Sequence, residues 1–118
     1  MSGILGVMRK DGRPVTAQTL APIRRAMTRW GPAGYGSWHA DAVGFGHLNL
    51  RVTPESRYDC QPVSLSIGAE LTITADARID NRAELLDRLG VLKGERATLP
   101  DSLLILRAYQ RWGSTCVE

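Results

Sequence analysis

The sequence predicts one α+β domain, or part of one, and three observations support this fold class. The chain has 118 residues and a hydrophobic content of 43%, which is enough to bury one core. Short apolar runs typical of strands alternate with segments of helical periodicity. The sequence shows no internal repeat and no low-complexity segment that would indicate another architecture.

The first elements are a strand and a helix. Residues Gly3 to Met8 predict a strand that ends in a turn at Asp11–Gly12. A helix is expected next, with Thr19 as its N-cap and Pro22 in the tolerated first turn. Its apolar face comprises Leu20, Ile23, Met27 and Trp30. Residues 31–36 contain three glycines and a proline and predict a loop.

The middle of the chain predicts further strands. Residues Val43 to Val52 alternate in the manner of a strand. A loop is expected over residues 53–62. Residues 64–67 and 71–75 then predict a hairpin that turns at Gly68–Ala69.

Two helices are expected in the C-terminal part. Asn81 and Glu84 have the spacing of a capping box, and Gly90 would end that helix. Asp101 to Trp112 is the strongest helical segment, and Gly113 would end it. Its predicted apolar face comprises Leu104, Ile105, Ala108, Tyr109 and Trp112.

Charge and cysteine content exclude several classes of function. The formal net charge is +3, but the basic residues form no stripe and no aromatic side chains are interleaved with them. We therefore expect a solvated surface and no nucleic-acid partner. No apolar run approaches membrane length, so we expect no membrane partner and a cytoplasmic protein. Cys60 and Cys116, without nearby histidines, predict free thiols and no metal site.

The start of the chain, Met1 to Val7, resembles the N-terminus of class II glutamine amidotransferases, in particular the asparagine-synthetase family. That family begins Met-Cys-Gly-Ile, and the resemblance continues through most of the chain in the family's order and near its spacing. The later matching blocks are Thr28–Pro32, Gly46–Leu50, Gln61–Val63, Ala75–Asn81 and Asp101–Tyr109.

The resemblance implies a fold and a domain organisation. The expected fold is the αββα sandwich of the N-terminal nucleophile hydrolases, incomplete in this chain. Residues 1–118 would form the N-terminal part of the amidotransferase-like domain, and the ATP-dependent synthetase domain is absent from this chain. The sequence contains no Gly-rich phosphate loop. We therefore expect no cofactor in this chain, whereas ATP and Mg²⁺ would belong to the missing synthetase domain.

The family's catalytic nucleophile position is altered. In the family, removal of the initiator methionine exposes a cysteine whose own α-amine acts as its general base. Serine occupies this position here, as Ser2. A hydroxyl is a far weaker acid than a thiol, whose pKa is about 8.5. Serine still serves as nucleophile in other N-terminal nucleophile hydrolases, so the alternatives are a serine nucleophile and an ordinary small residue.

The family's oxyanion positions are altered as well. An asparagine amide and a glycine N–H within an Asn-Gly-Glu run stabilise the oxyanion in the family, and Asp76 and Ala77 align with them. An ionised Asp76 offers no donor and would oppose the developing negative charge. Losing one such donor costs about 3–4 kcal/mol. The alternative is a charged extended segment in which Arg78 pairs locally with its acidic neighbours.

The expected glutamine-binding positions are only partly kept. The arginine that binds the glutamine carboxylate in the family's His-x-Arg-Leu segment is replaced by Asn49. A neutral amide cannot form the bidentate ion pair, although Arg51 could substitute after a shift of register. Asp101 matches the aspartate that would bind the glutamine amine, but it is also a favoured residue at a helix start.

These departures predict a glutaminase that has lost its activity while keeping its fold. Further runs, including Asp11–Val15 and Thr53–Ser56, resemble the cyclases that close the macrolactam ring of lasso peptides. The first hypothesis is therefore the degenerate half of an ATP-dependent amide-forming ligase. The alternatives are a working glutamine-dependent asparagine synthetase or serine-type amidohydrolase, and a non-catalytic module that binds a peptide or protein. The implied partners are the C-terminal synthetase domain, a precursor peptide or leader-peptide-binding protein, and a second copy in a homodimer.

Overall fold

The computed structural model describes residues 2–30, 34–50, 58–65 and 70–117. The chain divides into two compact units. The first unit comprises Met1–Arg51, Cys60–Pro62 and Thr74–Asp76, and the second comprises the remaining residues.

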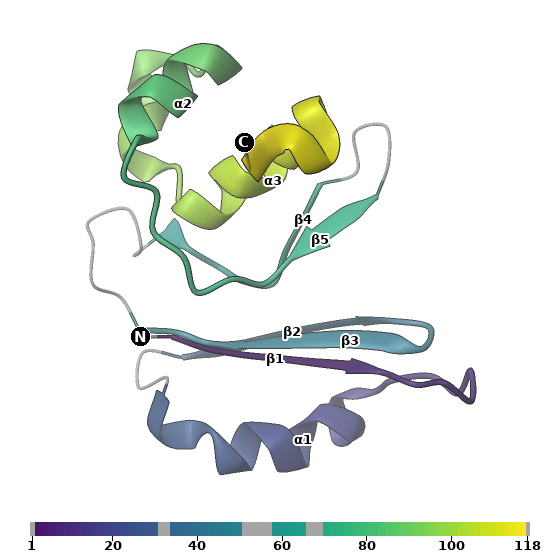
Figure 1. The fold of residues 1–118 in the computed structure, drawn as a ribbon. Coiled ribbons are helices and arrows are strands. Elements are labelled where there is room, and N and C mark those ends of the chain that lie inside the picture. Colours follow the sequence, from purple (N-terminus) through teal and green to yellow (C-terminus); the bar gives the residue numbers. More distant parts are fainter. Residues whose placement is uncertain (1, 31–33, 51–57, 66–69, 118) are drawn as a thin grey trace. The chain divides into compact units, whose positions relative to one another are not determined.

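The first unit is an antiparallel sheet covered by a helix. Its strands are β1 (Gly3–Met8), β2 (Tyr35–Ala40) and β3 (Val43–Leu48), in the order β1-β3-β2. Helix α1 (Ala17–Ala26) lies along one face of this sheet (Figure 1). A short 3₁₀ turn, η1 (Thr28–Trp30), follows it. The buried core between helix and sheet comprises Leu5, Val15, Leu20 and Leu48.

The strands of the first unit agree only in part with the sequence-based expectation. Strand β1 has the predicted bounds, whereas β3 ends at Leu48 rather than at Val52. Strand β2 was not predicted, and its first residues fall in the expected loop over residues 31–36. A Cβ on Gly36 would lie 2.1 Å from the carbonyl oxygen of Gln61. The glycine in this strand is therefore required by a close backbone approach, which is a tertiary feature.

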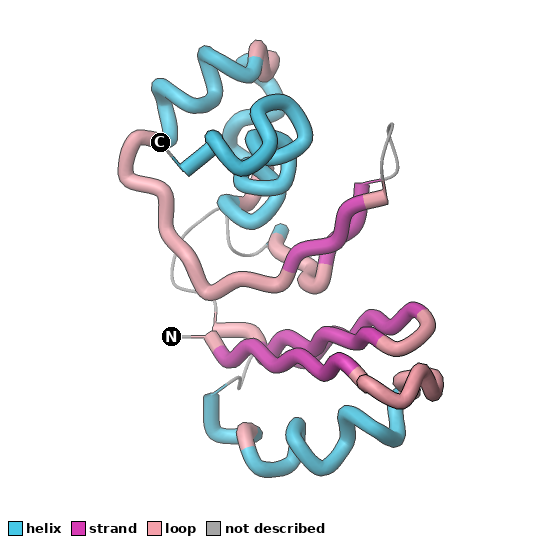
Figure 2. Tube along the Cα trace, turned by 45° about the vertical axis from the view of Figure 1, so that its right-hand side comes forward, coloured by secondary structure: helices cyan, strands magenta, loops and turns pink. Residues whose placement is uncertain are grey.

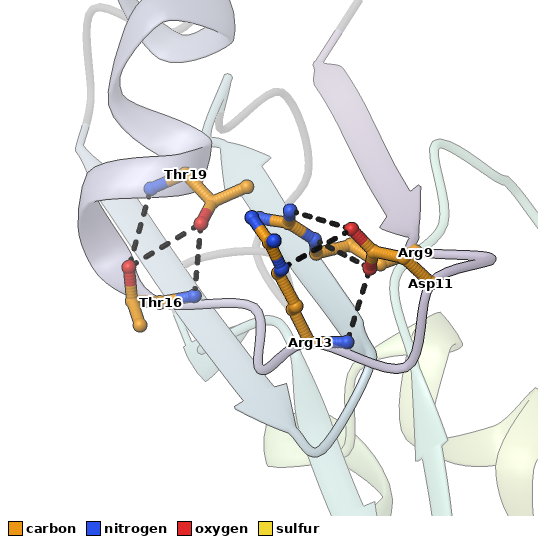
Figure 3. A network of polar contacts seen from close by, with 5 residues as sticks. All are labelled: Arg9, Asp11, Arg13, Thr16 and Thr19. Carbon is orange, nitrogen blue, oxygen red and sulfur yellow. Dashed lines mark hydrogen bonds and ion pairs between the residues drawn. The ribbon is translucent and has the colours of Figure 1, made fainter.

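Helix α1 begins earlier than expected. Thr16, not Thr19, is the N-cap, and the two threonines form a reciprocal capping box (Figure 3). Pro22 consequently lies inside the helix rather than in its first turn. The proline is exposed, so its ring occupies the solvent side, where the lost backbone hydrogen bond costs least.

An ion-pair cluster stabilises the turn between β1 and α1. Arg9 donates two hydrogen bonds to the Asp11 carboxylate, at 3.1 and 3.0 Å, and the Arg13 amide donates a third at 3.0 Å (Figure 3). The Arg9 side chain, followed by the Arg13 N–H, holds the pKa of Asp11 below its usual value. The predicted turn at Asp11–Gly12 is confirmed, with Gly12 at a φ of 75°.

The second unit contains a two-stranded antiparallel sheet and two helices. Strand β4 (Val63–Leu65) pairs with β5 (Leu71–Ile73), as the predicted hairpin requires, although its turn lies outside the described residues. Helix α2 (Arg82–Leu89) packs against α3 (Asp101–Trp112), and α3 also contacts both strands (Figure 1). The 3₁₀ segments are η3 (Lys93–Thr98) and η4 (Gly113–Val117). The core residues are Leu86, Val91, Leu99 and Leu104.

The two helices of this unit have nearly the predicted limits, but their details differ. Gly90 ends α2 in the left-handed conformation, with a φ of 69°. The predicted capping box is wrong, because Asn81 makes no side-chain cap hydrogen bond. Tyr109, which was expected on the apolar face of α3, is 47% exposed, whereas Leu106, which was not expected there, is buried. Helix α3 is contacted on more than one side, so its burial does not follow a single apolar stripe.

The described residues form a mixed α+β fold with small antiparallel sheets, and the predicted α+β class is confirmed. The αββα sandwich stays a prediction. A long loop from Thr74 to Asn81 follows β5 (Figure 2). Within the part of the chain that the structure describes, no helix has the length and apolar character needed to cross a membrane.

Candidate functional site

Ser2 lies directly before β1 and is bound to the backbone that follows β3. Gly3 is paired with Leu48, which places Ser2 beside the continuation of β3. The Ser2 hydroxyl accepts a hydrogen bond from the Leu50 N–H at 3.0 Å and can donate to the Leu50 carbonyl at 3.4 Å. The Ser2 hydroxyl can therefore bond with both the N–H and the carbonyl group of Leu50.

Asp76 lies at the nitrogen of Ser2. The Ser2 N–H donates to Asp76 Oδ1 at 3.3 Å, which joins residues 74 positions apart in the sequence. The structure thus brings together two of the positions that the sequence singled out. The carboxylate contacts the nitrogen that would become the α-amine after removal of Met1. Its effect on an oxyanion stays a prediction.

Two polar side chains position the segment that carries Asp76. Gln61 binds the backbone of Ala75 in both directions: Oε1 accepts from its N–H at 2.6 Å, and Nε2 donates to its carbonyl at 3.1 Å. Thr74 Oγ1 lies 3.1 Å from His47 Nδ1 and donates to the Gly46 carbonyl at 3.4 Å. Gln61 and His47 are 5% and 2% exposed. These contacts fix the backbone on the N-terminal side of Asp76.

Sequence reasoning did not identify the positioning role of Gln61. The residue appeared only as part of a matching block, and nothing in its immediate neighbours indicates a partner at Ala75. A glutamine directly before a proline in an otherwise loop-like stretch was the only available signal. The Gln61 side chain pairs with the Ala75 backbone much as a neighbouring strand would, because its amide offers the same donor and acceptor as a peptide group.

The predicted carboxylate-binding region contains a neutral side chain. Asn49 is half-buried, and its backbone N–H donates to the Gly34 carbonyl at 2.8 Å. The alternative cation, Arg51, lies outside the described residues. Asn49 can donate a hydrogen bond to an anion, but it supplies no positive charge.

The remaining candidates, Ala77 and Asp101, belong to the second unit. Ala77 is exposed and has no regular secondary structure. Asp101 is the first residue of α3, but it does not cap that helix. Its Oδ2 accepts from the Ile79 N–H at 3.0 Å, and its Oδ1 accepts from Arg82 Nη1 at 2.6 Å. Both carboxylate oxygens therefore have a partner within the chain.

Arg82 connects α2 with the segments around α3. Besides Asp101, it donates to the carbonyl oxygen of Arg96 at 2.6 Å and to that of Leu99. The Arg82 and Asp101 side chains are 19% and 21% exposed, so this is a largely buried ion pair. The sequence suggested a helix cap or a ligand for Asp101, and the observed partner is a cation of the chain itself.

The other charges near these positions agree with a solvated segment. Arg78 pairs with Asp80 at 3.2 Å, and both side chains are more than 80% exposed, as the local-pairing alternative predicted. Cys60 and Cys116 are free thiols. The described residues contain no cluster of histidine, cysteine and acidic side chains suited to a metal ion.

Comparison with known proteins identifies the family. The family model of the glutamine amidotransferase domain matches residues 1–118. The chain belongs to this family. The class II amidotransferase resemblance is therefore correct at the level of the domain over the whole chain. Among curated proteins and solved structures, nothing matches.

In this amidotransferase domain, two contacts define the surroundings of residue 2. The serine hydroxyl is held by a backbone group, and the nitrogen beside it contacts a carboxylate.

Proposed function

We propose that this chain is a degenerate glutaminase-like domain that serves as a scaffold in an ATP-dependent amide-forming ligase. Within the asparagine-synthetase family, the reaction that fits best is the closure of a macrolactam ring, as in the lasso-peptide cyclases. The membership of the chain in the amidotransferase family supports the first half of this proposal. The altered chemistry around residue 2 supports the loss of glutaminase activity.

The observation that carries the proposal is the environment of Ser2. To attack a glutamine amide, the hydroxyl must leave the Leu50 backbone and transfer its proton to the residue-2 amine. The first step breaks hydrogen bonds worth about 1 kcal/mol each. The second step needs an unprotonated amine, which the Asp76 carboxylate disfavours. Both effects add to the intrinsically weak acidity of a serine hydroxyl.

The positions expected to hold glutamine support the same conclusion. Asn49 supplies no charge for the substrate carboxylate. The oxygens of Asp101 already accept hydrogen bonds from Arg82 and the Ile79 backbone. A substrate ammonium would have to compete with a guanidinium held by two further carbonyl groups.

Loss of the glutaminase is chemically reasonable in a ligase whose substrate carries its own amine. ATP would convert a side-chain carboxylate into an acyl adenylate with release of pyrophosphate. The amine of the same peptide would then attack the acyl carbon, lose a proton and displace AMP. Ammonia is not consumed in this sequence. ATP and Mg²⁺ would bind in the synthetase domain, and this chain would contact that domain and the precursor peptide.

Glutamine hydrolysis tests the loss of activity. We expect the wild-type chain and Ser2→Ala to release glutamate from glutamine at the same rate as buffer. The assay should cover a range of glutamine concentrations, so that a saturable enzyme rate can be separated from spontaneous deamidation. Saturable release by the wild type that disappears in Ser2→Ala would support the serine-type amidohydrolase instead.

The gene beyond the codon for Glu118 tests the ligase half. The proposal expects the reading frame to continue into a synthetase domain with a Ser-Gly-Gly-x-Asp-Ser phosphate loop. A stop codon at this point would support the alternative of a stand-alone binding module.

A further inference from the structure

The nitrogen of Ser2 faces the carboxylate of Asp76, an exposed side chain on the segment that follows β5. Ser2 N and Asp76 Oδ1 are 3.3 Å apart. In the chain that begins with Met1, this nitrogen is an amide and makes an ordinary hydrogen bond. Removal of Met1 by hydrolysis of the Met1–Ser2 peptide bond would convert the same nitrogen into a primary α-amine, which can carry a positive charge.

We propose that, once Met1 is removed, the Ser2 α-ammonium and the Asp76 carboxylate form an ion pair that anchors the N-terminus. Asp76 would then be a positioning residue that keeps the amine protonated, so that the amine is a structural cation rather than a general base. This inference deepens the proposed function and rests on it in one respect, namely that residue 2 has no catalytic role to preserve.

Other contacts hold the backbone on both sides of this pair, although the Asp76 side chain itself is exposed. The Ser2 side chain is bound to the Leu50 backbone. The residue before Asp76 is bound in both directions by the buried Gln61 side chain. The ion pair therefore requires little additional ordering of either chain segment. A low ordering cost is the condition under which a partly exposed ion pair persists.

Few other ionisable groups compete for the amine. Strand β1 carries no ionisable side chain, the neighbouring β3 carries one, His47, and helix α1, which packs against β1, carries the exposed cations Arg24 and Arg25. The His47 ring is 2% exposed, and its Nδ1 lies 3.1 Å from Thr74 Oγ1. Along the segment that contacts Ser2, residues 74–76, Asp76 is the one acidic residue. Asp76 is thus the group whose charge most directly sets the protonation of this amine.

Even a modest rise in the pKa of the α-amine strongly reduces its unprotonated fraction at neutral pH. An unperturbed α-amine has a pKa of about 7.7–8.0. An opposite charge within hydrogen-bonding distance raises the pKa of an amine, and because the Asp76 side chain is exposed the rise is up to about one unit. Each unit reduces the unprotonated fraction at neutral pH about tenfold. The amine would be protonated across the whole range in which a cytoplasmic enzyme works.

The experiment measures the titration of the N-terminal amine itself. Intact mass first establishes whether the purified protein begins at Ser2. The rate of labelling of the α-amine by an amine-specific reagent is then followed from pH 6 to pH 10, with the N-terminal peptide quantified by mass spectrometry. Wild type is compared with the isosteric Asp76→Asn and with Asp80→Asn, which removes an exposed acid of the same loop that pairs with Arg78.

We expect the wild-type midpoint to lie above the ordinary α-amine range and the Asp76→Asn midpoint to fall by about one unit. The labelling rate at pH 7 should then rise about tenfold in Asp76→Asn and remain unchanged in Asp80→Asn. Equal midpoints for wild type and Asp76→Asn would overturn the proposal. An equal fall in Asp80→Asn would overturn it as well, because that result would reflect net charge alone, and so would retention of Met1.

A measurement on the wild type guards against misfolding of the variant. Raising the salt from low ionic strength to 1 M should lower the wild-type midpoint, because salt screens a partly exposed ion pair. A midpoint within the ordinary range at both salt concentrations would overturn the proposal without any variant. The result is also separable from the proposed function. Glutaminase activity together with a raised midpoint would contradict the proposed function and the structural role of the amine but leave the ion pair itself standing, and an ordinary midpoint without activity would contradict only this inference.

Discussion

Replacement of Arg82 by methionine should strongly destabilise the second unit. Arg82→Met keeps most of the aliphatic side chain but removes the guanidinium that binds Asp101 at 2.6 Å and the carbonyl of Arg96 at 2.6 Å. The Asp101 carboxylate would keep its hydrogen bond from the Ile79 N–H and lose its counter-charge. If Asp101 instead served to bind a ligand and its contact with Arg82 contributed little, Arg82→Met would lower the free energy of unfolding far less.

The expected magnitude follows from the burial of the pair. Removing one partner of a fully buried ion pair costs about 3–5 kcal/mol. Arg82 and Asp101 are 19% and 21% exposed, so water compensates for part of the loss. We expect the free energy of unfolding to fall by about 3 kcal/mol, which for a domain of this size lowers Tm by roughly 12 °C.

Thermal and urea unfolding at pH 7 provide the assay, and Arg78→Met is the matched control. Arg78 forms an ion pair with Asp80, but its side chain is 81% exposed, so the control should lose at most about 0.5 kcal/mol. A double-mutant cycle with Asp101→Asn should show a coupling energy of about 1–3 kcal/mol. Equal stability of the two arginine variants, or strict additivity in the cycle, would refute the structural role of Asp101.

Three further predictions concern the first unit. Gly36→Ala should destabilise the chain by more than about 2 kcal/mol in urea unfolding, because its Cβ would lie 2.1 Å from the Gln61 carbonyl; an unchanged midpoint would show that β2 can shift. Gln61→Leu should cost about 2–3 kcal/mol in the same assay, since it leaves the Ala75 backbone without its two partners; a neutral result would mean that water replaces the amide. The depressed pKa of Asp11 means that the stability contributed by its carboxylate is fully present above about pH 4 and is lost as the pH falls through the folded-state pKa. The difference in free energy of unfolding between wild type and Asp11→Asn should therefore shrink on acidification, and a pH-independent difference would contradict this.

The elements that the sequence predicted well are those with local signals. Strand β1 and helices α2 and α3 are bounded by alternation, periodicity and terminal glycines, all of which lie within a few residues of each other. Strand β2 was missed because its sequence contains a glycine and polar residues. Its place in the sheet depends on pairing with β3 and on the close approach of Gln61. Local propensity does not contain that information.

The candidate site shows the same division. The family resemblance located Ser2, Asp76 and Asp101, but it could not give their partners. The contact between Ser2 and Asp76 spans 74 residues, and Asp101 meets Arg82 across 19 residues. Neither contact follows from spacing, because the first depends on how the loop after β5 returns to β1 and the second on how α2 and η3 bring Arg82 back to the start of α3. Reasoning by alignment places a residue at a position, whereas only the tertiary structure shows which group its charge meets.

The proposed loss of glutaminase activity is tested most directly by glutamine hydrolysis in two variants. These are Ser2→Cys and the combined variant Ser2→Cys, Asp76→Asn, Ala77→Gly and Asn49→Arg. The two proteins are assayed at equal concentration for glutamate release. We expect no enzymatic release from Ser2→Cys, because Asp76 remains beside the residue-2 nitrogen. Asp76 would also still stand where we propose that an oxyanion donor has been lost, a change that would cost about 3–4 kcal/mol. The combined variant should show weak, saturable turnover, since residues that act as one catalytic unit recover together. Robust activity of Ser2→Cys alone would contradict the account, because it would show that the rest of the glutaminase site is intact.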